Sequence, residues 1–175
     1  MMALETALLQ ELSKISDLLK GELSAQGHRN TGSLERSFTQ EVRREGGLLI
    51  GTIKANDYAI HLEFGVPASR IPFSPGSGAK SSKYIAGLIN YFTTKGLASN
   101  DARSAAFATA YVHKREGMPT RASFAYSSNG RRTGFMRTTL TQYLPTLVNN
   151  LQAAGAQEVN VQIAGNTFAL NLQII

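Results

Sequence analysis

Residues 38–55, FTQEVRREGGLLIGTIKA, decide the fold of this chain. Gly46-Gly47 separates two runs of alternating side chains, and a glycine pair accepts the positive φ angles of a two-residue hairpin turn. With that turn Val42 opposes Gly51 and Phe38 opposes Ala55. One face of the resulting hairpin then carries the apolar side chains, namely Phe38, Val42, Leu49, Ile53 and Ala55. The stretch therefore predicts two antiparallel strands, 38–45 and 48–55, that bury one face.

A helical pattern precedes this hairpin. Leucine and isoleucine recur every three or four residues between Ala3 and Gln26, at Leu4, Leu8, Leu12, Ile15 and Leu19. This spacing predicts an amphipathic helix that ends near Gly27. We interpret it as a core helix, with a partner-binding helix as the alternative. A short helix should follow, capped by Thr31 or Ser33.

Three more helices are expected after the hairpin. Residues 66–79 hold three prolines and predict a loop. Ser81 or Ser82 should cap a helix that ends at Gly96, and Asn100 should cap the next one, which runs to Gly117. A third apolar stripe extends over 136–151. Pro145 lies inside it and predicts a kink or a break near residues 141–144.

The last segment, residues 158–174, predicts a second hairpin. If Gly165-Asn166 is its turn, three apolar pairs share one face: Val159 with Leu172, Val161 with Leu170, and Ile163 with Phe168. An isolated hairpin is barely stable, so this one must join a sheet or cover a helix. We expect its apolar face to pack against the body of the protein or against a neighbouring subunit.

Together these patterns predict an α+β fold in which antiparallel hairpins pack with several amphipathic helices. The chain has 175 residues, of which 42% are hydrophobic and 17% are charged, as in ordinary globular proteins. We expect a single domain spanning 1–175, with a basic insertion of helices and loops at about 66–132. We also expect no membrane span, because no continuous apolar run of about 20 residues is present, and no signal peptide at the amino terminus.

The positive charge is concentrated in the middle of the sequence. Residues 64–137 hold eleven Lys and Arg against two acids, whereas the flanking segments are slightly acidic. Such a block is either a solvated face or a surface for nucleic acid or an acidic protein. The candidate contact residues surround a helix end and a glycine-containing loop: Lys114, Arg115, Arg121, Arg131 and Arg132. We expect this loop to be mobile alone and to become ordered on a negatively charged partner.

The sequence offers little for catalysis. It contains no cysteine, which excludes disulfides, thiol nucleophiles and cysteine-based zinc sites. The three histidines, His28, His61 and His113, fall in separate predicted elements. Glu63 is the acid in the most apolar context, and we expect it to cap backbone amides or meet an arginine rather than act as a general base. We therefore expect no enzyme activity, no metal and no cofactor.

The order of the elements resembles the tail-completion and head-to-tail joining (neck) proteins of tailed bacteriophages. Residues 91–96 resemble the family's aromatic residue followed by a lysine-glycine helix end, and three further short motifs carry the resemblance. After the first helix comes a threonine-glycine-x-leucine motif, then a tyrosine followed by a glutamate-aromatic-glycine turn, and finally a helix ending in a glycine-x-proline turn. The matching residues are Thr31, Gly32, Leu34, Ser37, Tyr58, Glu63, Phe64, Gly65, Gly117 and Pro119.

This resemblance implies a structural protein of the virion, assembled in the cytoplasm of the host bacterium. It implies a homo-oligomeric ring of about six copies, closed by rotational symmetry, between the head connector and the tail. The partners would be other neck, connector and tail proteins, and the ring would line the channel and touch the packaged DNA without sequence preference. It implies no enzyme and no membrane. The alternative from the charge pattern is a basic nucleic-acid-binding module.

Overall fold

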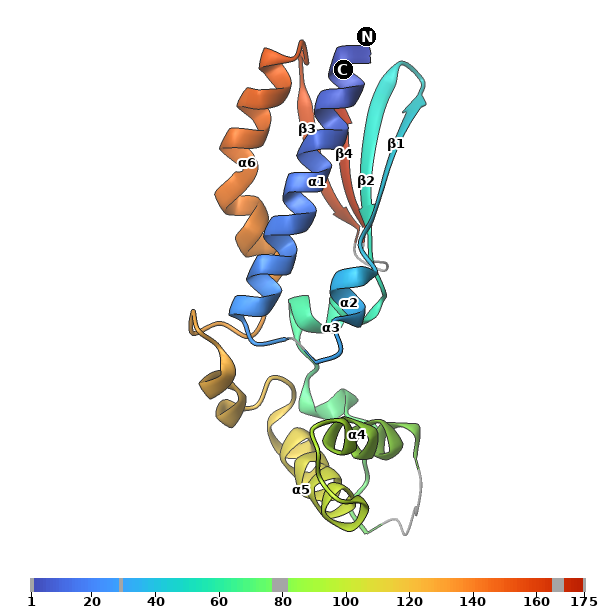
Figure 1. Ribbon diagram of the computed structural model, residues 1–175, viewed down its shortest axis with the longest axis vertical. Coiled ribbons are helices and arrows are strands. Elements are labelled where there is room, and N and C mark those ends of the chain that lie inside the picture. Colours follow the sequence, from blue (N-terminus) through green and yellow to red (C-terminus); the bar gives the residue numbers. More distant parts are fainter. Residues whose placement is uncertain (1, 29, 77–81, 165–168, 175) are drawn as a thin grey trace. The chain divides into compact units, whose positions relative to one another are not determined.

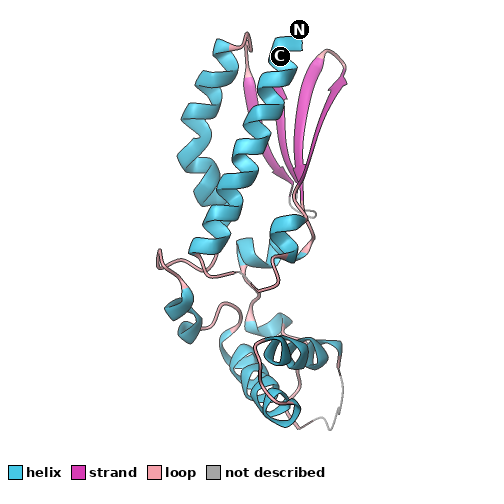
Figure 2. Ribbon diagram, in the orientation of Figure 1, coloured by secondary structure: helices cyan, strands magenta, loops and turns pink. Residues whose placement is uncertain are grey.

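The computed structural model describes residues 2–28, 30–76, 82–164 and 169–174, and its fold is α+β, as the sequence predicts. Antiparallel hairpins and amphipathic helices make up the domain (Figures 1 and 2). The chain forms two compact units. The first comprises Met1–Phe64 and Ala125–Ile175, and the second comprises Gly65–Phe124. The strands belong to the first unit, and the second is built of helices (Figure 2).

The first hairpin has the predicted register. It consists of β1 (Thr39–Glu45) and β2 (Leu48–Lys54), and Val42 pairs with Gly51 across it. Both turn glycines have positive φ, +56° for Gly46 and +86° for Gly47. The glycine pair and the alternating pattern were therefore sufficient to define this hairpin.

The second hairpin completes the sheet. It consists of β3 (Val159–Ala164) and β4 (Ala169–Ile174), and β4 pairs with β2, so the strand order is β1-β2-β4-β3 with every pair antiparallel. The prediction that this hairpin joins a sheet is confirmed. Its predicted register is wrong by two positions, because Val161 pairs with Leu172 and the pair nearest the turn among the described residues is Ala164 with Ala169. The predicted turn at Gly165-Asn166 and the predicted pair residue Phe168 lie outside the described residues.

Two long helices cover one face of this sheet. Figure 1 shows α1 (Met2–Ala25) and α6 (Phe135–Ala153) side by side along it. The predicted stripe of α1 is buried from Leu8 to Leu19, whereas Leu4 is only partly buried. The stripe meets Leu49 and Ile53 of β2 and Leu147 and Leu151 of α6 in one core. Gly51 allows α1 to approach closely, because a Cβ there would lie 3.0 Å from methyl groups of Leu8 and Leu12.

α6 is one helix and contains Pro145, so of the two predicted alternatives the break is wrong, and the kink stays a prediction. Proline removes the hydrogen bond to the carbonyl oxygen of residue 141. Thr141 and Pro145 are both exposed, so water can solvate that carbonyl group and the helix continues.

A buried polar cluster ties α1 to α6. Glu11 is only 3% exposed, and its carboxylate accepts hydrogen bonds from the Tyr143 hydroxyl (2.7 Å), the Asn150 amide (3.1 Å) and the Lys14 ammonium (2.7 Å). Burial alone would raise the pKa of Glu11, but these three donors outweigh it and hold the pKa below its ordinary value. Burial and the neighbouring carboxylate raise the pKa of Tyr143 to about 12.

Two short helices complete the first unit. α2 (Ser33–Arg36) follows the turn after α1, and α3 (Tyr58–Phe64) follows β2. The predicted cap is wrong, since the residue before α2 is Gly32, at φ +70°, and no side chain caps the helix.

The second unit contains the helices α4 (Lys83–Thr94) and α5 (Ser99–Glu116). It also contains the 3-10 helix η1 (Ala68–Arg70) and most of the 3-10 helix η2 (Arg121–Tyr126), whose last two residues belong to the first unit. Ser82 caps α4 as predicted, because its hydroxyl accepts the Ile85 N–H at 3.1 Å. The cap predicted at Asn100 is wrong: the N-cap residue is Ala98, so α5 begins at Ser99, two residues earlier than predicted. The Tyr84 hydroxyl and His113 Nδ1, 2.6 Å apart, join the two helices, and burial lowers the pKa of His113.

Candidate functional site

The threonine-glycine-x-leucine motif forms a compact hydrogen-bonded turn in the first unit. The Thr31 hydroxyl accepts the Ser33 N–H at 3.3 Å, and the Arg36 guanidinium donates to the Thr31 carbonyl oxygen at 3.0 Å. Gly32 is required here because its φ is +70°. Leu34 packs against the core. Each motif position thus has a local structural role.

Ser37 connects this turn to the segment before α3. Its hydroxyl donates to the Leu34 carbonyl oxygen at 2.7 Å and accepts the Asn56 N–H at 3.0 Å. The Asn56 carbonyl oxygen in turn accepts the Ala59 N–H at 2.9 Å, at the start of α3. Residues about 20 positions apart are therefore held together by one serine side chain.

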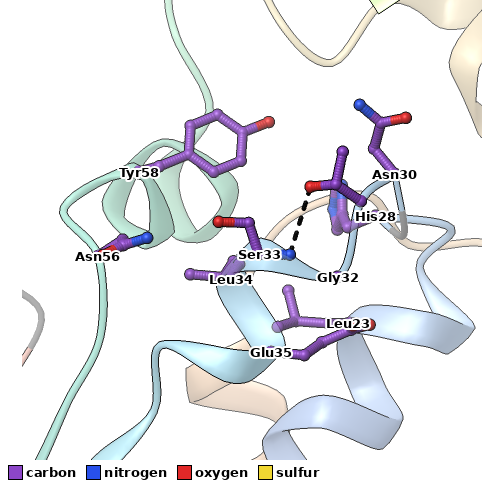
Figure 3. A pocket seen from close by; sticks show the side chains of 10 residues that line it. Leu23, His28, Asn30, Gly32, Ser33, Leu34, Glu35, Asn56 and Tyr58 are labelled. Atoms are coloured by element: carbon purple, nitrogen blue, oxygen red, sulfur yellow. Dashed lines mark hydrogen bonds between the residues drawn. The ribbon is translucent and has the colours of Figure 1, made fainter. Parts of the chain in front are cut away.

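A hollow of about 270 Å³ lies beside this turn, and Figure 3 shows the side chains around it. Its lining combines hydroxyl, amide and carboxylate groups with a few apolar surfaces, from Leu23, His28, Asn30, Thr31, Gly32, Ser33, Leu34, Glu35, Asn56 and Tyr58. Tyr58 is 57% exposed. The hollow offers hydrogen-bond donors and acceptors to a small polar group, such as a side chain of a neighbouring protein.

His28 is held in place at the edge of this hollow. Its Nε2 lies 3.0 Å from the Arg132 carbonyl oxygen, a hydrogen bond in which the ring nitrogen donates. Burial, assisted by the positive charge of Arg132, lowers the pKa of His28 to about 4. The imidazole is therefore neutral near pH 7 and acts as a structural link.

Glu63 caps the first turn of α6, as the sequence predicts. It is 5% exposed, and its carboxylate accepts the Met136 N–H at 2.8 Å and the Arg137 N–H at 3.3 Å. The Glu63 carbonyl oxygen also accepts the Gly134 N–H at 2.9 Å. A carboxylate at a helix N-terminus satisfies free amides and complements the helix dipole. Glu63 therefore fixes α3 to α6.

The other two glycines of the motifs meet in the second unit. Val66 and Met118 exchange two backbone hydrogen bonds, of 2.7 and 2.8 Å. Gly65 precedes Val66 and Gly117 precedes Met118, and both glycines have positive φ, +73° and +81°. A Cβ on Gly65 would lie 2.6 Å from the Met118 carbonyl oxygen, and one on Gly117 would lie 2.7 Å from that of Val66.

Pro119 is part of the same contact, because its Cδ would lie 3.4 Å from a Cβ on Gly65. Gly65 and Pro119 are more than fifty residues apart in the sequence. We call the contact between residues 65–66 and residues 117–119 the glycine bridge. The motifs that prompted the resemblance therefore occupy three defined contacts: the turn at 31–37, the Glu63 cap and the glycine bridge.

The predicted contact cations divide between the two units. Lys114, Arg115 and Arg121 belong to the second unit, and Arg131 and Arg132 belong to the first. Two of them serve the fold: Lys114 donates to the Ile71 carbonyl oxygen at 3.2 Å, and the Arg132 guanidinium donates to the Gln26 carbonyl oxygen. Arg115 is exposed beside Glu116, which its guanidinium meets at 2.7 Å.

Arg121 and Arg131 are exposed at the surface. The Arg121 backbone N–H donates to the Glu116 carboxylate at 3.1 Å, and the Arg131 guanidinium lies 3.4 Å from the Thr138 hydroxyl. Arg115 and Arg121, together with Glu116, Pro119 and Phe124, line a second hollow of about 500 Å³ in the second unit.

The loop that carries Arg131 and Arg132 is attached to the end of α1. The Ser128 N–H donates to the Ala25 carbonyl oxygen at 2.8 Å, and the Asn129 amide donates to Glu22 at 2.9 Å. The Gln26 amide donates to the Thr133 carbonyl oxygen at 3.1 Å. These hydrogen bonds hold the loop and come from the chain itself. From the sequence, a negatively charged partner was expected to order this loop.

Two findings bear on other classes of function. Among the described residues, no group of three or more His, Asp or Glu side chains is placed to hold a metal ion. None of the helices in the described ranges has the length and apolar character that crossing a membrane requires.

Sequence reasoning missed several of these features. It did not assign α3 as a helix, and it did not identify Asn56 or the Ser127-Ser128 contact with α1. It also left out a regular spacing that was visible in the sequence: Arg103, Phe107, Tyr111 and Arg115 follow one another at intervals of four residues.

Comparison of the chain with protein-family models, with curated proteins and with solved structures gives no match. What the protein does must therefore be argued from its own residues and their contacts.

Proposed function

We propose that this chain is a virion structural protein of a tailed bacteriophage. In this proposal it forms a closed ring of about six copies at the head-tail junction or at the top of the tail. The ring joins the head connector to the tail and surrounds the DNA channel. It is assembled in the bacterial cytoplasm and has no catalytic step.

One observation carries the proposal. The motifs that resemble those of the neck family are short and degenerate in sequence, yet several of their residues have specific structural tasks. Ser37 connects the first motif to Asn56, Glu63 caps α6, and Gly65 meets Pro119 in the glycine bridge. Short motifs that matched by chance would not be expected to fall on the residues that join distant segments.

The surface of the first unit also suits a ring. A closed heterologous ring needs two different patches on each subunit. Large apolar side chains are exposed on three of its helices: Leu9 and Leu18 on α1, Tyr58 and Phe64 on α3, and Leu144 on α6. Phe64 is 58% exposed although it follows the buried Glu63. Aromatic side chains such as Tyr58 and Phe64 are enriched at protein-protein interfaces.

A second candidate function, a basic nucleic-acid-binding module, is favoured by the charge of the second unit. Residues 65–124 hold eight Lys and Arg against two acids, a net charge of +6, which is the net charge of the whole chain. The first unit is therefore neutral overall. The two functions are compatible if the ring touches DNA.

Genetic complementation tests the proposal. The gene for this chain is deleted from the phage that encodes it. Particles are then examined by electron microscopy with and without the wild-type protein supplied from a plasmid. The expected result is filled heads and separate tails in the deletion, and joined particles after complementation. Normal joined particles without the protein would contradict the proposal.

A further inference from the structure

The helix α5 carries cations and aromatic rings along one side. Arg103, Phe107, Tyr111 and Arg115 are spaced by four residues, so each follows the last one turn along the helix. The row spans about 18 Å at 1.5 Å per residue. Arg103 lies over the Phe107 ring, with 5.8 Å from its guanidinium carbon to the ring centroid. We call this row the α5 stripe.

The aromatic rings of the stripe are fixed in place. Phe73 packs edge-on against Tyr111 with the ring centroids 5.0 Å apart, and it also meets Phe107 at 6.4 Å. The bond from Lys114 to the Ile71 carbonyl oxygen holds the loop that carries Phe73. Tyr111 nevertheless remains 52% exposed. A fixed, half-exposed ring offers a flat surface for stacking at little cost in side-chain entropy.

The stripe continues beyond the helix end. Arg115 also lines the second hollow, together with Arg121 and Phe124, and Phe124 is 44% exposed. This part of the second unit therefore alternates cations with exposed rings. A neighbouring side of α5 is apolar, because Ala102, Ala106 and Ala110 are fully buried.

We propose that the α5 stripe, with Arg121 and Phe124, binds single-stranded nucleic acid without sequence preference. Arginine side chains would contact phosphates, and bases would stack on Tyr111 and Phe124. Sequence-independent single-strand binding combines these two features, a positively charged track and exposed aromatic rings. Phosphate-only binding of a duplex would need the cations but not the rings. An acidic protein would likewise be attracted by charge alone.

The charge of the second unit supports this partner. Its net charge of +6 attracts a polyanion, and the two acids leave most of the cations without a counterpart. The inference does not rest on the proposed ring, since the surface lies within one unit of one chain.

Binding of a fluorescein-labelled 20-nucleotide oligothymidylate to the purified full-length protein tests the proposal. The expected result is saturable binding in 50 mM salt. Affinity should fall by about twentyfold between 50 and 200 mM salt, the dependence expected for roughly three phosphate contacts on a single strand. Absence of binding at 50 mM salt would overturn the proposal.

Variants distinguish stacking from charge. Tyr111→Leu keeps apolar packing against Phe73 but removes the stacking ring, and it should weaken binding by about fivefold or more. The matched control is Tyr91→Leu on α4, where a 40% exposed tyrosine also has a cation, Lys95, over its ring. Thermal melting of both variants verifies folding. Equal losses in both variants, or no loss in Tyr111→Leu, would overturn the proposal.

A second pair of variants tests the position of the charges. Arg103→Ser with Arg115→Ser should weaken binding more than Lys83→Ser with Lys95→Ser, although both pairs remove two positive charges from the same unit. Competition tests the class of partner: a 20-base-pair duplex and polyglutamate should each compete less well than unlabelled oligothymidylate. Equal or better competition by either one would overturn single-strand recognition.

Discussion

At Gly65 the backbone adopts φ +73°, and the space beside its Cα is occupied by the Met118 carbonyl oxygen. A side chain here meets both a conformational penalty and a backbone clash. We predict that Gly65→Ala lowers the free energy of unfolding by at least about 1–2 kcal/mol, the cost of a left-handed residue. Urea denaturation of the wild type and the variant measures this difference in unfolding free energy.

The control is Gly87→Ala in α4 of the same unit, where nothing lies within 4 Å of an added Cβ. That substitution should be neutral or should stabilise by roughly 0.5–1 kcal/mol. A Gly65→Ala variant as stable as Gly87→Ala would contradict the role assigned to the glycine bridge.

Glu63 is the other residue whose role is local and testable. Glu63→Ala would leave two N-terminal amides of α6 without their acceptor, and we predict a loss of about 1–3 kcal/mol in unfolding free energy. Glu63→Gln keeps one acceptor oxygen and should lose less.

Asp17→Ala provides a matched control, since it removes a carboxylate whose ion pair with Lys20 is exposed and worth only about 0.2–1 kcal/mol. If Glu63→Ala and Asp17→Ala destabilise equally, Glu63 is not an important cap.

At the scale of elements, the contact between the end of α1 and the loop before α6 responds to pH. The pKa of His28 is lowered to about 4 in the folded protein and is near 6.5 when the chain is unfolded. As the pH falls, His28 is therefore protonated in the unfolded state before it is protonated in the folded state. This link is fully effective above about pH 6.5, and stability is lost as the pH falls from 6.5 toward 4.

We predict that His28→Gln loses less unfolding free energy than the wild type when the pH is lowered from 7 to 5. The pKa of His113 is also lowered, so the variant should retain part of the dependence. Parallel stability curves for the two proteins over this range would refute the prediction.

The second hairpin supplies half of the sheet. A chain ending at Gln157 lacks β3 and β4 and leaves the edge of β2 unpaired. Exposed strand edges and uncovered core surface promote aggregation. We predict that this truncated protein is insoluble when expressed under conditions that yield soluble wild type. A soluble truncated protein with a cooperative thermal transition would count against the prediction.

Elements with strong periodicity could be predicted from the sequence. The stripe of α1, the register of β1 with β2 and the Ser82 cap of α4 all follow from local patterns. The helix α3 could not, because its seven residues are too few for a clear period and a contact of Glu63 with α6 holds it. The register of β3 with β4 could not be predicted either, because a shift of two positions leaves every side chain on the same face of the sheet and so does not change the alternating pattern.

The same distinction applies to the candidate site. The capping role of Glu63 was predictable because a lone carboxylate in an apolar stretch needs donors. The tasks of Lys114 and Arg132 were not, because sequence does not reveal which cation will reach a backbone carbonyl from a distant segment. The five predicted contact cations were chosen because positive charge is dense in that part of the sequence. Only the contacts in the folded protein distinguish the cations that stabilise the fold from those that are exposed.

At the scale of the whole molecule, the net charge lies in the second unit, whereas both units expose large apolar side chains. The second unit holds the net charge of +6, and the first unit, with no net charge, exposes large apolar side chains on α1, α3 and α6. A ring component that both binds its neighbours and touches DNA needs surfaces of both kinds. The proposed ring uses the first unit for subunit contacts, and the separate inference on the α5 stripe assigns nucleic-acid contact to the second unit.

The most direct test of the proposed function is the location of the protein in purified phage particles. Antibody labelling viewed by electron microscopy, combined with peptide quantification by mass spectrometry, measures both position and copy number. The account predicts label at the head-tail junction or the top of the tail and about six copies per particle, the number that the resemblance to the neck family implies. Washed, infectious particles that lack the protein would contradict it.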